Sequence, residues 1–215
     1  MGRLIVFGDV HGCADELKEL FDKLAVTSSD QLVSVGDLIC KGPSSAKVLD
    51  MAMSMPNLCC ILGNHEFRFL ACWRGKQIPD IKPYDRETVR QMGDRYEEFM
   101  DYIFRWPFYL DLEEALVVHA GLRPNVPLWE QKKIDLVKLR RIEPEDKPWY
   151  EFYRGSKPVV FGHWVRREPL LLKNVIGLDT GCVYGGRLSA CVFPERKIVS
   201  VPARKTYVAR KDKWE

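Results

Sequence analysis

Six side chains that can donate oxygen or imidazole nitrogen to a metal ion stand just beyond short apolar runs of the chain. They are Asp9, His11, Asp37, Asn64, His119 and His163. Carboxylate, amide and imidazole donors suit hard and borderline divalent ions. Six donors, with one carboxylate shared, are about what two adjacent octahedral ions need once water completes the coordination. The pattern therefore predicts a two-metal site.

Two ions held side by side favour displacement at phosphorus. Ions about 3.5–4 Å apart activate a bridging water and neutralise the oxygens of a phosphoryl group. The predicted reaction is therefore hydrolysis of a phosphoester or phosphoanhydride bond. A single histidine at a strand end is more often structural than a ligand. Here, however, all four histidines of the chain lie in matching Gly/Asp/Asn/His contexts, which favours a shared site.

The apolar runs before these motifs are typical of buried strands. They cover residues 4–7, 32–35, 58–62, 116–118 and 159–161. Apolar periodicity between the first three runs predicts helices over 14–24 and 44–53. Strands that alternate with helices indicate a parallel sheet, in which ligands bind at the carboxyl ends of the strands. All of the polar motifs stand at such ends.

Two other segments have different sequence patterns. Residues 66–105 are charged and helical in pattern, and they predict a helical, cap-like excursion over one side of the domain. After His163, short runs at 175–178, 188–193 and 198–201 predict a β-meander that completes a second sheet.

The whole-chain composition indicates an ordinary globular protein. With 215 residues and no linker or repeat, the chain is expected to form a single domain over 1–215. A net charge of +3 is nearly balanced and gives no sign of a nucleic-acid or membrane partner. The absence of a membrane-length apolar stretch and of a signal-peptide core predicts a cytoplasmic protein. The seven cysteines are expected to be reduced thiols.

The motifs resemble those of the calcineurin-like metallophosphoesterases, and the likeness runs from Gly8 to about Val201 in the right order. It rests on Gly8-Asp9-Val10-His11-Gly12, on Gly36-Asp37 to Gly42, on Gly63-Asn64-His65-Glu66, on His119-Ala120-Gly121 and on Gly162-His163. The resemblance implies an α/β fold of the αββα sandwich type, with two mixed β-sheets flanked by helices. It places a dimetal site at one edge of the sheets.

The resemblance also implies a role for each ligand. Asp9 and His11 would hold the first metal, Asp37 would bridge the two metals, and the second would be held by Asn64, His119 and His163. The cofactor is therefore expected to be two divalent ions. We expect Mn²⁺ first, with Fe, Co²⁺, Zn²⁺ and Mg²⁺ as alternatives, because all of them accept such ligands.

Other residues would act on the substrate. In the family the histidine at position 65 protonates the leaving oxygen, a role suited to imidazole. Arg140 resembles the family's arginine that binds the phosphoryl oxygens, although Arg141 is an equally basic neighbour. The predicted catalytic residues are His65, Asp37 and Arg140, and the predicted phosphate contacts are Lys41, Arg140, Asn64 and His65.

Two sister groups of the family share this metal set: Ser/Thr phosphoprotein phosphatases and symmetrical bis(5'-nucleosyl)-tetraphosphatases. Phosphatases carry Gly-Asp-x-x-Asp-Arg-Gly, whose second Asp orients the general-acid histidine, but this chain has Cys40 and Lys41 there. Leu62 and Trp164 also look more like the tetraphosphatases, whereas Glu66 favours the phosphatases.

The missing carboxylate at position 40 affects which leaving groups the enzyme is expected to expel. A serine alkoxide is a poor leaving group that needs a well-supported acid, whereas a nucleoside diphosphate leaves readily. We therefore expect a preference for diadenosine tetraphosphate, cut symmetrically to two ADP, or for related nucleoside polyphosphates. The alternative is a Ser/Thr or broad-specificity phosphoprotein phosphatase, and a weaker one is an idle binding module. Cys40 itself is either a buried filler or a redox-sensitive thiol.

Overall fold

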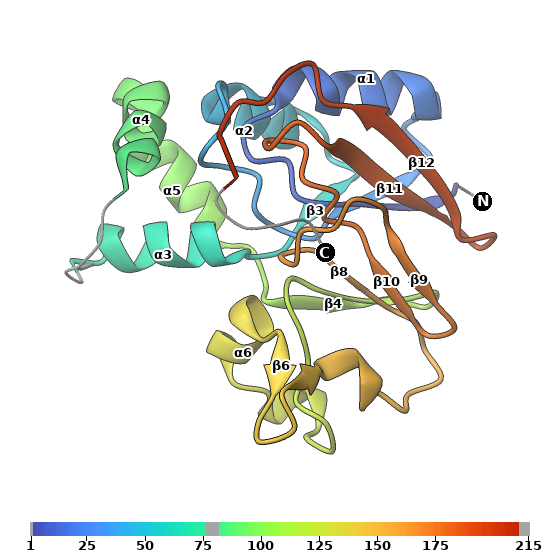
Figure 1. Cartoon of the computed structure of the whole chain (residues 1–215). Coiled ribbons are helices and arrows are strands. Elements are labelled where there is room, and N and C mark those ends of the chain that lie inside the picture. Colours follow the sequence, from blue (N-terminus) through green and yellow to red (C-terminus); the bar gives the residue numbers. More distant parts are fainter. Residues whose placement is uncertain (1, 76–81, 211–215) are drawn as a thin grey trace.

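A computed structural model describes residues 2–75 and 82–210 and contains two five-stranded mixed sheets that face each other (Figure 1). The first sheet has the order β12-β11-β1-β2-β3, with β1 at Leu4–Phe7, β2 at Gln31–Ser34, β3 at Leu58–Cys60, β11 at Arg187–Phe193 and β12 at Lys197–Pro202. The second has the order β4-β5-β8-β10-β9, with β4 at Tyr109–Asp111, β5 at Leu116–Val118, β8 at Val159–Phe161, β9 at Leu170–Leu172 and β10 at Val175–Gly177.

Alternating side chains of β1 explain why the sheets stack. Successive residues of a strand point to opposite faces. Leu4 and Val6 pack between the two sheets, against residues such as Val160 and Ile176. Ile5 and Phe7 point the other way and pack with the helices over the first sheet. Because both faces of the strand are apolar and buried, the sheet lies inside the molecule.

Helices cover the outer faces of both sheets. α1 (Ala14–Leu24) and α2 (Ser45–Ser54) lie over the first sheet. α6 (Lys133–Lys138), the 3-10 turn Trp149–Glu151 and the small hairpin of β6 (Arg141–Ile142) and β7 (Lys147–Pro148) cover the second. This arrangement of helix, sheet, sheet and helix confirms the predicted αββα sandwich.

The start of the chain follows the prediction closely. β1 pairs in parallel with β2, and β2 pairs in parallel with β3. The helix predicted over 14–24 is α1, and the one predicted over 44–53 is α2. The polar motifs therefore stand at the carboxyl ends of neighbouring strands, as ligand-binding residues do in such sheets.

The prediction for the last strands was wrong in one respect. Of the three runs predicted to form the meander, only the first, β10, joins the second sheet, where it pairs with β8 and β9. β11 instead pairs antiparallel with β1 and carries β12 to the edge of the first sheet. The pattern of β11 does not reveal this, because Ala190 packs on the helical side while Cys191 packs between the sheets. A strand that is apolar on both faces fits the middle of either sheet.

The segment over 66–105 is helical where the structure describes it. α3 (Asn64–Trp73) is followed by α4 (Pro83–Met92), the 3-10 turn Gly93–Arg95 and α5 (Tyr96–Phe104). α4 contacts α2, and its Gln91 amide accepts from the Ser45 nitrogen at 2.7 Å and donates to the Gly42 carbonyl at 3.2 Å. The part of the segment at 76–81 lies outside the described residues, and its role as a cap stays a prediction. No helix within 2–75 and 82–210 is long and apolar enough to cross a membrane.

Candidate dimetal site

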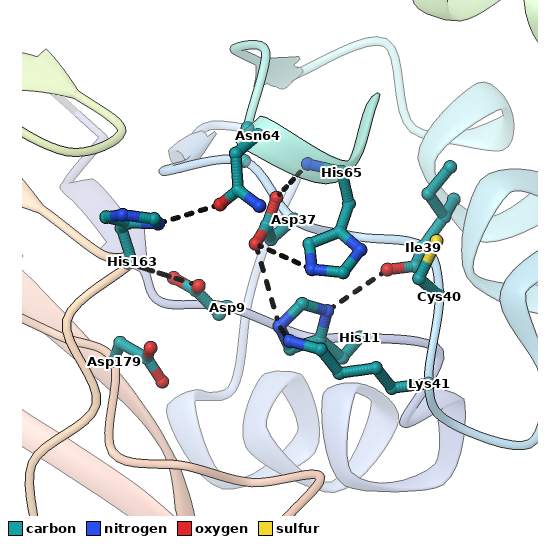
Figure 2. Close-up of polar contacts among 12 residues, drawn as sticks. Asp9, His11, Asp37, Ile39, Cys40, Lys41, Asn64, His65, His163 and Asp179 are labelled. Carbon is teal, nitrogen blue, oxygen red and sulfur yellow. Dashed lines mark hydrogen bonds and ion pairs between the residues drawn. The ribbon is translucent and has the colours of Figure 1, made fainter. Parts of the chain in front are cut away.

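The sheet topology gathers the six predicted ligands at one edge, although they come from five separate segments; all of them except His119 are labelled in Figure 2, and His119 Nε2 is 2.9 Å from Asn64 Oδ1. Asp9 and His11 follow β1, Asp37 follows β2, Asn64 opens α3 after β3, His119 follows β5 and His163 follows β8. Within each sheet these strands end at one edge, because β1, β2 and β3 run parallel, as do β5 and β8. The two edges meet, since His119 and His163 both contact Asn64.

Asp37 lies at the centre of the cluster. Its Oδ2 is 3.6 Å from His11 Nε2, 3.6 Å from His119 Nε2 and 4.0 Å from His65 Nε2. Its Oδ1 accepts a hydrogen bond of 3.0 Å from the backbone nitrogen of His65. A carboxylate between imidazoles from both halves of the set has the position that a bridging ligand needs, and that role stays a prediction.

His119, Asn64 and His163 form a second group beside Asp37. His119 Nδ1 donates to the Val35 carbonyl at 2.8 Å, so in the neutral ring Nε2 carries a lone pair. That lone pair faces Asn64 Oδ1 at 2.9 Å, and the same oxygen is 2.7 Å from His163 Nδ1. Two acceptors this close repel each other unless they bind a common cation, and neighbouring ligands of one octahedral ion with bonds of about 2.1 Å are about 3 Å apart. The group therefore fits a divalent ion.

His11 is oriented in the same way. Its Nδ1 donates to the Ile39 carbonyl at 3.1 Å, which leaves the Nε2 lone pair directed at the site. The Lys41 ammonium donates to this Nε2 at 2.8 Å and so lies inside the cluster. The predicted phosphate contact of Lys41 is thus compatible with its place, although an ion bound to His11 would require Lys41 to move from this nitrogen.

Burial makes the cluster a strong cation acceptor. Burial lowers the pKa of His11 to about 3, with Lys41 adding to the effect, and burial also lowers the pKa of His119, so both imidazoles are neutral, the form in which imidazole can bind a metal. Burial, together with Asp179 and Asp37, raises the pKa of Asp9 well above its ordinary value. Crowded buried carboxylates beside neutral imidazoles repel one another, and divalent ions would relieve this repulsion.

The loops that carry the ligands adopt unusual backbone conformations. His11, Asp37 and His163 have positive φ angles of 48°, 52° and 63°. Non-glycine residues seldom adopt such values, and strained positions concentrate at functional sites. Gly162 allows a close approach, because a Cβ there would lie 2.0 Å from Asp9 Oδ1. The backbone nitrogen of His163 therefore reaches both Asp9 oxygens, at 3.2 and 3.1 Å.

Glu66 connects the loop of Asp37 to the start of α3 through hydrogen bonds. It is fully buried, and its Oε2 accepts from the Asp37 nitrogen at 2.9 Å and from the Gly63 nitrogen at 3.1 Å. Its Oε1 accepts from the Ile39 nitrogen at 3.1 Å. The residue that looked like a substrate discriminator in the sequence therefore has a structural role, since it fixes the loop of Asp37 relative to the start of α3.

Glu66→Gln is expected to destabilise the fold by about 2–3 kcal/mol, because the new amide would face a buried N–H group and leave it without an acceptor. Urea unfolding measures this as a lower midpoint with an unchanged slope. Glu19→Gln on the exposed face of α1 is the matched control. An unfolding midpoint of Glu66→Gln equal to that of the control would show that the three hydrogen bonds contribute little.

His65 has neighbours on the side away from Asp37 that the sequence did not indicate. Arg68, one turn along α3, has its Nη2 3.2 Å from His65 Nδ1 and pairs with the Asp85 carboxylate of α4. Asp85 also accepts from the Cys40 thiol at 3.7 Å. Burial, with Glu66 and Asp85, raises the pKa of Cys40 well above its ordinary value, which favours the buried filler over the redox-sensitive thiol.

The two candidate arginines differ in their surroundings. Arg140 donates from Nη2 to the His163 carbonyl at 2.9 Å, so its guanidinium is next to a predicted ligand. Arg141 bonds to the Asp146 carbonyl and stacks 5.6 Å from the Trp164 ring. The geometry therefore favours Arg140 for a phosphate contact, which stays a prediction.

Three acidic or basic residues near the site were not among the predicted site residues, although Asp179-Thr180-Gly181-Cys182 stood out in the sequence as a motif similar to that of the tetraphosphatases. Asp179 lies beside Asp9 in Figure 2, and burial raises its pKa to about 6. Asp85 is far along the chain and reaches the site only through the packing of α4. Arg68 could have been found, since it stands three residues after His65 on one helix face.

Comparison with known proteins agrees with this geometry. The family model of the calcineurin-like phosphoesterases matches residues 2–169. A bis(5'-nucleosyl)-tetraphosphatase PrpE [asymmetrical] of Anoxybacillus flavithermus is 30% identical, covering 96% of each chain. The PrpE of the same description from Oceanobacillus iheyensis is 28% identical, covering 97% of this chain and 96% of that one.

A solved structure is similar over nearly the whole length. A crystal structure described as a candidate diadenosine tetraphosphatase is 33% identical, has a TM-score of 0.82 and covers 94% of each chain. Calcineurin-like phosphoesterases are dimetal enzymes, in keeping with the donor set around Asp37. The chain therefore belongs to the calcineurin-like phosphoesterase family and is a hydrolase of phosphoric esters or anhydrides.

Proposed function

We propose that this chain is a dimetal hydrolase of dinucleoside polyphosphates, with diadenosine tetraphosphate as the reference substrate. The observation that carries the proposal is the arrangement around Asp37, whose Oδ2 lies within 3.6 Å of imidazole nitrogens from both predicted ligand groups. Together with the acceptor pair of His119 and Asn64, this arrangement suits two ions rather than one.

Each residue has a definite role in this proposal. Asp9 and His11 would hold one ion, Asn64, His119 and His163 would hold the other, and Asp37, which lies between the two groups, would serve both. Two divalent ions, with Mn²⁺ as the first expectation, would supply an activated water and positive charge for the phosphoryl oxygens. Lys41 and Arg140 bind phosphate oxygens from two sides of the cluster, and His65 directs its Nε2 toward the leaving oxygen.

The leaving group supports an anhydride substrate. Position 40 holds a buried thiol where a phosphatase has a carboxylate for the general-acid histidine. A polyphosphate leaving group spreads its charge over several oxygens and needs less help from an acid than a serine alkoxide does. The named PrpE relatives and the similar crystal structure favour the same substrate class.

The position of the cut is a finer question. The sequence predicted the symmetrical cut to two ADP, which is not confirmed and becomes the alternative. The PrpE relatives are described as asymmetrical, and for this chain we therefore propose a cut between the first and second phosphorus, which releases ATP and AMP. Water attack at the phosphorus that carries adenosine would expel ATP, the polyphosphate leaving group that needs little help from an acid, whereas attack at the neighbouring phosphorus would expel AMP.

Anion-exchange analysis of the products tests the substrate and the cut together. With Mn²⁺ and diadenosine tetraphosphate we expect equal amounts of ATP and AMP from the outset of the reaction. ADP alone would establish the symmetrical cut instead. A phosphothreonine peptide assayed at equal enzyme is expected to have a kcat/KM at least 10-fold lower, about 1.4 kcal/mol in barrier height.

The alternative function is a Ser/Thr or broad-specificity phosphoprotein phosphatase. Its support is the Gly63-Asn64-His65-Glu66 motif, which is commoner among phosphatases at its last position. Glu66, however, accepts three backbone hydrogen bonds and has no free oxygen directed at a substrate. A higher kcat/KM on the phosphopeptide than on the dinucleotide would make this alternative the function.

A further inference from the structure

The imidazole of His65 lies between a carboxylate, which accepts hydrogen bonds, and a guanidinium, which donates them. Its Nε2 faces the Asp37 carboxylate, with Oδ2 at 4.0 Å. Its Nδ1 faces the guanidinium of Arg68, with Nη2 at 3.2 Å. The ring is buried and also packs edge-on against the His11 ring at 4.9 Å between centroids, so it has little freedom to turn over.

Arg68 determines which ring nitrogen carries the hydrogen. A guanidinium has five N–H donors and no acceptor, so the nitrogen that faces it has to accept. In the neutral ring, Nδ1 therefore carries the lone pair and Nε2 carries the hydrogen. That hydrogen points toward Asp37, at the centre of the predicted metal cluster, where the leaving oxygen of a substrate would lie.

Asp85 holds the guanidinium in this place. Its Oδ1 pairs with Arg68 Nη2, while its Oδ2 accepts from the backbone nitrogen of Lys82 at 2.9 Å, at the start of α4. The carboxylate is only 6% exposed, and it also accepts from the Cys40 thiol. Arg68 further lies over the Tyr84 ring, with its Cζ 5.8 Å from the centroid.

Arg68 reverses the hydrogen-bonding roles that the two ring nitrogens of a general-acid histidine are expected to have. A carboxylate at position 40 would accept from Nδ1–H, and Nε2 of the neutral ring would carry the lone pair. Here Asp85 supplies a carboxylate to the same region, but Arg68 stands between it and His65. The result is a hydrogen-bond donor, rather than an acceptor, directed at the reacting centre by the neutral ring.

We propose that Arg68, held by Asp85, is a positioning residue that fixes His65 with its Nε2 hydrogen toward the leaving oxygen. This inference rests on the proposed function, and it narrows the substrate class. A donated hydrogen bond stabilises the charge of a polyphosphate leaving group, whereas an alkoxide requires a complete proton transfer. The Arg68–Asp85 pair therefore favours anhydride over alkyl ester substrates.

A double-mutant cycle tests whether Arg68 acts through His65. Arg68→Met keeps the length of the side chain but removes the donors. Its kcat on diadenosine tetraphosphate is expected to fall about 10- to 100-fold with KM changed less than about 2-fold, the range for losing a group that orients a functional imidazole. In a His65→Asn background, the same substitution is expected to change kcat less than about 2-fold.

Three further variants complete the series. Arg68→Lys is expected to recover part of the loss, since it retains a donor but lacks the planar guanidinium whose Nη2 contacts both His65 and Asp85. Asp85→Asn is expected to lower kcat less than Arg68→Met. Arg90→Gln, which removes an exposed ion pair with Glu87 on α4, is the matched control and should leave kcat unchanged. Equal losses from Arg68→Met in both backgrounds would overturn the proposal in favour of a purely structural role.

Nitrogen-15 NMR of the metal-free protein gives a readout that does not depend on activity. The His65 ring, identified by its absence in His65→Asn, is expected to carry its hydrogen on Nε2 in the wild type and on both nitrogens in exchange in Arg68→Met. A wild-type hydrogen on Nδ1 would overturn the proposal. If diadenosine tetraphosphate is not hydrolysed, the proposed function fails, while the NMR result still decides the orientation of His65.

Discussion

Asp37→Asn is expected to lower kcat by at least about 10³-fold, which corresponds to about 4 kcal/mol of barrier height. The change keeps the size of the side chain and the acceptor for the His65 nitrogen, which Asp37 Oδ1 provides at 3.0 Å. It removes the negative charge that lies 3.6 Å from both His11 and His119. A neutral amide cannot offset the charge of two adjacent ions, so at least one of them should be lost.

Elemental analysis and turnover together check this prediction. Wild-type protein is expected to bind two ions per chain and Asp37→Asn one or none. Asp22→Asn is the matched control, because Asp22 is an exposed carboxylate paired with Lys18 on α1. Full metal content in Asp37→Asn with normal turnover would show that the cluster does not depend on a bridging carboxylate.

Removal of the metals adds a second readout of the same cluster. Ligands that bind only the folded state stabilise it by mass action. Divalent ions would also stabilise the charged form of Asp9, whose pKa is raised by burial and by the neighbouring Asp179 and Asp37. A chelator is therefore expected to lower the unfolding temperature of the wild type, and to lower that of Asp37→Asn much less.

The gathering of the predicted metal ligands at one edge could be foreseen from the sequence because each of them follows a strand in a short Gly/Asp/Asn/His motif. Apolar runs of three to five residues marked the strands, and the first three strands are parallel, as the helices between them required. Once the strands are neighbours, their carboxyl ends meet at one edge. The local pattern at Asp9, Asp37 and Asn64 therefore contained enough information to place these side chains together.

The surroundings of His65 could not be predicted in the same way. Asp85 lies in α4, and it reaches Cys40 and Arg68 only because α4 packs against α2. No spacing within the sequence reports on such packing. The pairing of β11 with β1 was also hidden, because a strand buried on both faces fits either sheet. Contacts between distant elements thus decide the features that most affect substrate choice.

His65→Asn is expected to lower kcat about 10²- to 10⁴-fold, the usual contribution of a positioned proton donor, with little change in KM. His65 Nε2 lies 4.0 Å from Asp37 Oδ2, close enough to the cluster to reach a leaving oxygen there. The metal content is the decisive control, because His65, His11 and Asp37 also have ligand atoms within 4.8 Å of one another. Unchanged metal content with reduced kcat would support the proton-donor role, whereas the loss of an ion would make His65 a ligand.

The size of the loss should also depend on the leaving group. If His65 donates only a hydrogen bond, His65→Asn should affect diadenosine tetraphosphate less than a phosphothreonine peptide, because the alkoxide depends more on the donor. Asn can donate through its amide, so His65→Ala should be the more damaging substitution on both substrates. Equal losses on both substrates would mean that leaving-group stabilisation does not limit turnover, and the substrate preference would then have to arise from Lys41 and Arg140 rather than from His65.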